Sequence, residues 1–144
     1  MRKAWKAIMA TAGILVLSAV NVFAFENKES ILSFTTNGQK DDTDELGYKV
    51  SDGDNYGYIT TLSSYNGKTS GVFPRGGTFY ARVRNASQPS YIYTDLFTFT
   101  ANGSQSEPYN STLFNSYYFV RGETEGITYP YPSGYVYQCL RWCP

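Results

Sequence analysis

The 144-residue chain contains no histidine. Histidine is the commonest general base in enzymes, a frequent zinc ligand and the usual side chain for a charge switch near neutral pH. Its absence excludes a serine–histidine–aspartate or cysteine–histidine catalytic site within the chain. No other motif selects a catalytic residue or a cofactor site, so the sequence predicts a protein without enzymatic activity and without a cofactor.

Long apolar runs are also scarce, and the chain has only one, over residues 7–20. It follows the basic residues of segment 1–6 and precedes Ala24, a small residue of the kind found before a cleavage site. This three-part pattern is typical of a bacterial secretory signal peptide, and the run is short for a membrane span. We expect a signal peptide over residues 1–24 and a single mature domain over residues 25–144. An uncleaved membrane anchor is the alternative.

Positive charge is in short supply once the signal is removed. The formal net charge is zero, but Arg2, Lys3 and Lys6 lie in the signal, which leaves nine basic residues against twelve acidic ones, or about −3. This charge balance does not indicate the basic surface that nucleic-acid binding requires. No later apolar run approaches spanning length, so we expect no stable membrane insertion of the mature chain. The expected partner is an extracellular protein or a cell-envelope glycan.

Cysteine is limited to Cys139 and Cys143. Export favours oxidation of cysteine pairs, so we expect these two to form a disulfide. In an extended strand their Cα atoms would lie about 13 Å apart, whereas a disulfide needs less than about 7 Å. The bridge therefore requires the chain to turn back between them, over residues 140–142. A redox site and a zinc site are both poorer interpretations of two cysteines without histidine.

Helical periodicity is nearly absent from the mature part, and turn residues separate short aromatic and β-branched runs. This pattern predicts an all-β fold, a small antiparallel β-sandwich or flattened barrel of about six to seven strands. A helix over residues 41–49 is a weak alternative for that segment. Six large apolar side chains are expected in the core: Phe79, Val83, Phe97, Phe99, Tyr118 and Val120. The expected strands are residues 31–36, 56–62, 70–73, 78–84, 91–100, 116–121 and 135–140.

Tyrosine is the conspicuous abundance, with 14 residues that all follow the signal. Most are expected to pack across strands, with the ring half buried and the hydroxyl wet. Some are candidates for a contact face, because tyrosine offers a large contact area at low entropic cost. The candidate contact residues are Tyr80, Arg82 and Arg84, which share one side of an alternating strand, together with Trp142. A soluble, charged strand surface is the alternative interpretation.

Acidic residues crowd the segment from Asp41 to Asp54. Converging carboxylates are what calcium requires, and Asp52 and Asp54 are the weak candidate ligands. The loop departs from the calcium-binding pattern, because Tyr56 stands where an aspartate or asparagine is needed and Ser63 where the closing acid is needed. We therefore favour a solvated acidic loop and assign no metal site. Two of these carboxylates could in principle perform acid–base catalysis, but the spacing selects no pair.

The run Ser33-Phe34-Thr35, followed by aromatic strands and a tyrosine-rich C-terminal segment, resembles small exported β-rich proteins of Gram-positive bacteria. Some proteins of this kind are similar to lactococcin-type β-sandwich bacteriocins. The resemblance is one of strand spacing and composition, and no functional residue is carried over from it. It implies export and a sandwich architecture rather than an activity, and the cysteine-containing tail departs from it.

Together these observations predict a secreted or cell-surface protein that acts as a non-enzymatic interaction module. Two alternatives belong to other classes. One is a bacteriocin-like toxin that acts on the cell envelope, and the other is a small hydrolase that uses carboxylates of the acidic segment.

Overall fold

The computed structural model describes residues 27–129 and 134–144. The expected signal peptide, residues 1–24, lies outside them. The described residues form antiparallel sheets and one short 3-10 turn, η1 (Phe73–Arg75), and include no α-helix. They therefore hold no helix with the length and apolar character that a membrane crossing needs. The expectation of an all-β fold is confirmed.

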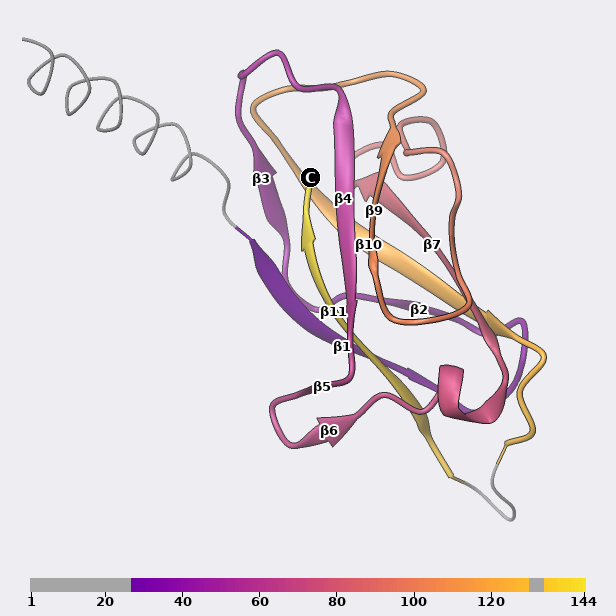
Figure 1. The fold of residues 1–144 in the computed structure, drawn as a ribbon. Coiled ribbons are helices and arrows are strands. Elements are labelled where there is room, and N and C mark those ends of the chain that lie inside the picture. Colours follow the sequence, from indigo (N-terminus) through magenta and orange to yellow (C-terminus); the bar gives the residue numbers. More distant parts are fainter. Residues whose placement is uncertain (1–26, 130–133) are drawn as a thin grey trace, which may run out of the picture.

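One sheet places the last described strand between two early ones. Its strand order is β1-β11-β4-β9, and all three strand pairs are antiparallel. Figure 1 shows the C-terminal strand running between β1 and β4. The strands are β1 (Lys28–Phe34), β4 (Tyr56–Leu62), β9 (Ser104–Pro108) and β11 (Val136–Cys143).

The second sheet is built around the longest strand, β10. Its order is β2-β10-β7-β8. β2 and β3 pair with different parts of the same edge of β10. The pairing of β10 with β7 is the most extensive, with eight residues of each strand in antiparallel register. The strands are β2 (Lys40–Asp42), β3 (Gly47–Lys49), β7 (Thr78–Asn85), β8 (Phe97–Phe99) and β10 (Ser116–Glu125).

A two-stranded hairpin, β5 (Ser64–Tyr65) and β6 (Lys68–Thr69), lies beside β11. Asn66 and Gly67 form its turn, with φ values of 46° and 75°. Positive φ at both central residues is the requirement of the turn that joins twisted antiparallel strands, and the Asn-Gly pair meets it.

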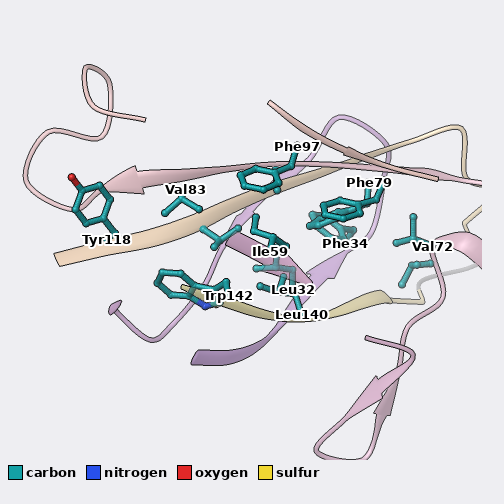
Figure 2. Packing of buried hydrophobic residues seen from close by; sticks show 14 of the residues in the cluster. Leu32, Phe34, Ile59, Val72, Phe79, Val83, Phe97, Tyr118, Leu140 and Trp142 are labelled. Atoms are coloured by element: carbon teal, nitrogen blue, oxygen red, sulfur yellow. The ribbon is translucent and has the colours of Figure 1, made fainter. Parts of the chain in front are cut away.

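The core lies between the two large sheets, which bury their inward side chains in one cluster. Figure 2 shows Phe79, Val83 and Phe97 of the second sheet pointing toward Leu32, Leu140 and Trp142 of the first. The six core residues expected from the sequence are all buried. Burial of each large apolar side chain contributes about 1.5–3 kcal/mol. Neither sheet closes on itself, so the flattened barrel expected as one alternative does not form.

Three local expectations are wrong. The segment expected as a strand over residues 91–100 is strand only at β8, because a turn at Gln88 and two isolated bridges occupy its first half. The weak helix over residues 41–49 is replaced by the end of β2 and by β3. The strand expected over residues 70–73 is a single bridge at Ser70 followed by η1.

The expected disulfide is also wrong, because Cys139 and Cys143 form no disulfide bond. Both lie in β11, which is paired continuously on each side and does not turn back between them. The extended backbone holds their Cα atoms about 13 Å apart, so no bridge can form. Each thiol is instead buried, and that of Cys139 donates to the carbonyl oxygen of Lys68 at 3.5 Å.

Lys49 is a buried cation at one end of the core, with 2% of its surface exposed. Its Nζ donates to the backbone oxygen of Pro144 at 3.0 Å and lies 5.3 Å from the centroid of the Tyr109 ring and 5.9 Å from that of Phe114. Burial lowers its pKa, and the charges of Asp54 and Asp52 oppose that shift. The aromatic rings and this backbone oxygen replace part of the hydration that burial removes.

Candidate functional site

Three of the four expected contact residues lie together on the outer surface of β7. Phe79, Ala81 and Val83 point into the core, so the alternation of the strand turns Tyr80, Arg82 and Arg84 outward. The outward residues are partly exposed. We call this surface the arginine–tyrosine face. It comprises Tyr80, Arg82 and Arg84 of β7, Tyr117, Phe119 and Arg121 of β10, Tyr48 of β3, and Tyr93.

The register between β7 and β10 brings the arginines together. Arg82 lies directly opposite Arg121, and Arg84 lies opposite Phe119. Like charges directly opposite each other in an antiparallel pair are destabilising. The arginine–tyrosine face therefore concentrates positive charge at a cost to the sheet.

Asp42 of β2 offsets part of this charge. Its two carboxylate oxygens accept hydrogen bonds from Nε and one terminal nitrogen of Arg121, each at 2.7 Å. The hydrogen bond to Asp42 raises the pKa of Arg121, and partial burial opposes it. Both side chains are more than a third exposed, so the pair contributes at most about 1 kcal/mol to stability.

Arg82 and Arg84 have a different role, because each holds the 89–94 loop against the sheet. A terminal nitrogen of Arg82 donates to the carbonyl oxygen of Thr94 at 2.8 Å, and one of Arg84 donates to that of Pro89 at 2.7 Å. Both guanidinium groups lie near the Tyr93 ring, 5.0 Å and 5.5 Å from its centroid. Among the described residues neither arginine forms an ion pair with a carboxylate.

The Arg84 guanidinium lies in an electropositive environment. Burial lowers its pKa, and the positive charges of Arg121 and Arg82 lower it further. Its Nε is buried and has no hydrogen-bond partner. An arginine has five N–H donors, so each of these two side chains keeps donors that the protein does not use.

A shallow depression of about 150 Å³ opens among these side chains. It is open to solvent on one side and lies over β2, β7 and β10. Its lining side chains carry four cationic groups and one carboxylate. The side chains that line it are Lys40, Tyr80, Arg82, Arg84, Leu96, Arg121 and Glu123.

Exposed aromatic rings extend the face beyond the depression. Tyr48 and Tyr117 are 39% and 53% exposed, and their rings pack edge to face at 5.0 Å. Phe119 separates them from the arginines, and the Arg121 guanidinium lies 5.6 Å from its ring centroid. The face thus joins an aromatic end to a cationic end along β10.

Trp142, the fourth expected contact residue, does not belong to this face. It lies on β11 in the other sheet, points into the core and is 1% exposed. Its Nε1 lies 3.3 Å from Ser30 Oγ, to which it donates. Its role is core packing, and the expectation of a contact role is wrong.

The weak calcium candidates serve the local loop structure. Asp52 Oδ1 accepts the backbone N–H of Asp54 at 2.9 Å, and Asp54 Oδ1 accepts that of Tyr56 at 3.0 Å. The other oxygen of Asp54 accepts the Tyr58 hydroxyl at 2.8 Å. Desolvation, together with this hydrogen bond, raises the pKa of Tyr58 to about 12. Within the described residues no three acidic or cysteine side chains gather in a way that could hold a metal ion.

The sequence pattern missed part of the face. Tyr117, Phe119 and Arg121 alternate along β10, and that alternation was a usable signal for their common side. Nothing local in the sequence shows that Tyr93 folds back over Arg82 and Arg84, because that contact depends on the turn at Gln88.

The chain was compared with models of protein families, with curated proteins and with solved structures, and none of the three comparisons gave a match. The case for a function therefore depends on the geometry of the arginine–tyrosine face.

Proposed function

We propose that this chain is an exported, non-catalytic β-sandwich protein that binds an extracellular or cell-envelope partner through its arginine–tyrosine face. The observation that carries the proposal is the face itself. The paired strands β7 and β10 present guanidinium N–H donors without hydrogen-bond partners on the same surface as exposed tyrosines. A partner can reach these groups on the surface, without a deep cleft. Tyrosine and arginine are among the side chains enriched at protein contact surfaces.

Export supports this interpretation from the sequence side. The basic, apolar and small-residue segments of residues 1–24 are typical of a secretory signal. N-terminal sequencing of protein from the culture medium should give a chain that begins at Phe25. Recovery of the protein only from membranes, with Met1 intact, would contradict export.

The contact role is tested by retention on isolated cell envelopes. The exported protein should sediment with envelopes of the producing cells and of neighbouring species. A Tyr48→Ser/Tyr117→Ser variant should lose most of this retention, because it removes the exposed aromatic end of the face. The matched control is Tyr56→Ser/Tyr135→Ser, which removes two tyrosines exposed to a similar extent outside the face.

Circular dichroism should show that both double variants stay folded. The proposal is wrong if the wild-type protein is not retained, or if the two double variants bind equally well. An equal loss of envelope retention in both double variants would indicate nonspecific adsorption through exposed tyrosines rather than binding by a specific face.

A further inference from the structure

We propose that the depression on the arginine–tyrosine face binds the acidic groups of an anionic polysaccharide. This inference rests on the proposed function and adds the chemical class of the partner. The shared chemistry is an oxyanion, carried by a sugar as a carboxylate, phosphate or sulfate.

The unused donors are the first support. Arg82 and Arg84 each spend one terminal nitrogen on a loop carbonyl and form no ion pair among the described residues. Their loop contacts hold the guanidinium groups in place before any ligand arrives. Such fixed donors lose little side-chain entropy on binding, and the planar guanidinium fork matches an oxyanion.

The charge balance of the depression is the second support. Arg82, Arg84, Arg121 and Lys40 line it, and among the described residues Asp42, Glu123 and Glu125 are the acids that line it or bond to its lining side chains. The site is therefore positive by about one charge, in a mature chain that is negative overall. The opposition of Arg82 and Arg121 across the strands is a cost that a bound anion would relieve.

Shape and surroundings favour a polysaccharide over an acidic protein. The depression holds about 150 Å³, which suits one small acidic group rather than a docked protein segment. A stable protein interface buries about 800 Å² on each side, which a depression of this volume does not supply by itself. The exposed rings of Tyr48 and Tyr117 offer flat apolar surface on which sugar rings further along the chain can lie.

The test measures binding to defined polymers by calorimetry or biolayer interferometry. The probes are polygalacturonate, which carries carboxylates, dextran sulfate, neutral dextran, and poly-glutamate as the acidic protein mimic. Binding is expected for the two acidic polysaccharides and should weaken steeply as salt is raised from 50 to 500 mM. The ratio between those two polymers shows which oxyanion the site prefers.

Two pairs of variants locate the site. Arg82→Gln should weaken binding by about tenfold or more, because it removes a charged donor. Its matched control, Arg141→Gln, removes an arginine that pairs with Glu29 on the other sheet and should leave binding unchanged. Since Arg82 also holds a loop, Lys40→Glu provides a second variant that makes no loop contact, and Lys68→Glu on β6 is its control.

Each result bears on the inference. Equal binding to neutral dextran, or equal effects of Lys40→Glu and Lys68→Glu, would overturn it. Poly-glutamate binding as tight as that of the polysaccharides would overturn the choice of a glycan. Loss of envelope retention in the tyrosine double variant, with no effect of the Arg82 and Lys40 changes, would leave the contact face standing and refute only the anionic site.

Discussion

Gly122→Ala tests how closely the two large sheets approach each other. Gly122 lies in β10 and faces the core, opposite Ala81 of β7. A Cβ atom there would lie 2.4 Å from Leu32 Cδ1 and 2.6 Å from Phe79 Cε2. Carbon atoms in favourable contact are about 3.5–4.0 Å apart, so the added methyl would overlap two side chains by about 1 Å each.

The cost follows from the lack of room around these side chains. Leu32 and Phe79 are both fully buried, so neither can swing into solvent to admit the methyl group. Overpacking of this kind costs about 1–3 kcal/mol, and two simultaneous overlaps place Gly122→Ala near the upper end of that range. For a domain of this size the melting temperature, Tm, should fall by about 4–12 °C.

Urea unfolding at constant pH measures the effect, with Gly103→Ala as the matched control. A Cβ atom at Gly103 meets nothing within 4 Å, so this change should alter stability by less than about 0.5 kcal/mol. Combining Gly122→Ala with Leu32→Val should recover part of the loss, because valine lacks the Cδ1 atom that is overlapped. Equal urea midpoints for Gly122→Ala and Gly103→Ala would refute the close approach of the sheets.

Further measurements test the core, the buried lysine and the thiols. Phe97→Ala should cost about 3–5 kcal/mol in urea unfolding, because its ring is fully buried, while Tyr91→Ala, with 76% of the tyrosine exposed, should cost little. Burial lowers the pKa of Lys49 in the folded chain, so between that pKa and about 10.5 the unfolded chain binds more protons. Wild-type unfolding free energy minus that of Lys49→Met should therefore rise with pH in this window, by up to about 1.4 kcal/mol per unit, and a flat difference would contradict it. Alkylation of urea-unfolded, unreduced protein should modify both Cys139 and Cys143. An unalkylated protein whose mass is two hydrogen atoms below that of the reduced chain would show a disulfide instead.

Strand alternation was the part of the fold most open to sequence reasoning. β4 matches its expected bounds, and β7 matches within one residue, because each has a period of two between clear turn residues. The segment over residues 91–100 has the same aromatic alternation, yet Tyr91 is largely exposed and most of the segment is loop. Tertiary contacts decide its conformation, since Arg84 and Arg82 bond to the carbonyl oxygens of Pro89 and Thr94.

The candidate site was predictable only in part, for the same reason. The common side of Tyr80, Arg82 and Arg84 follows from their spacing in one strand. The position of Arg82 opposite Arg121 depends on the register between β7 and β10. These two residues are 39 positions apart, so no local sequence pattern predicts that they meet. Trp142 was misassigned because its place in a continuous strand, rather than in a closed turn, sends its side chain into the core.

The position of β11 in its sheet has a consequence for how the chain acquires its structure. Residue 28 pairs with residue 142, and β11, one of the two inner strands of the four-stranded sheet, is the last of the described strands to be synthesised. In this sheet β1 pairs only with β11 among the described strands, so it has no partner there until β11 has been synthesised. Such distant pairings also slow folding, with typical times of milliseconds to seconds for β proteins rich in them.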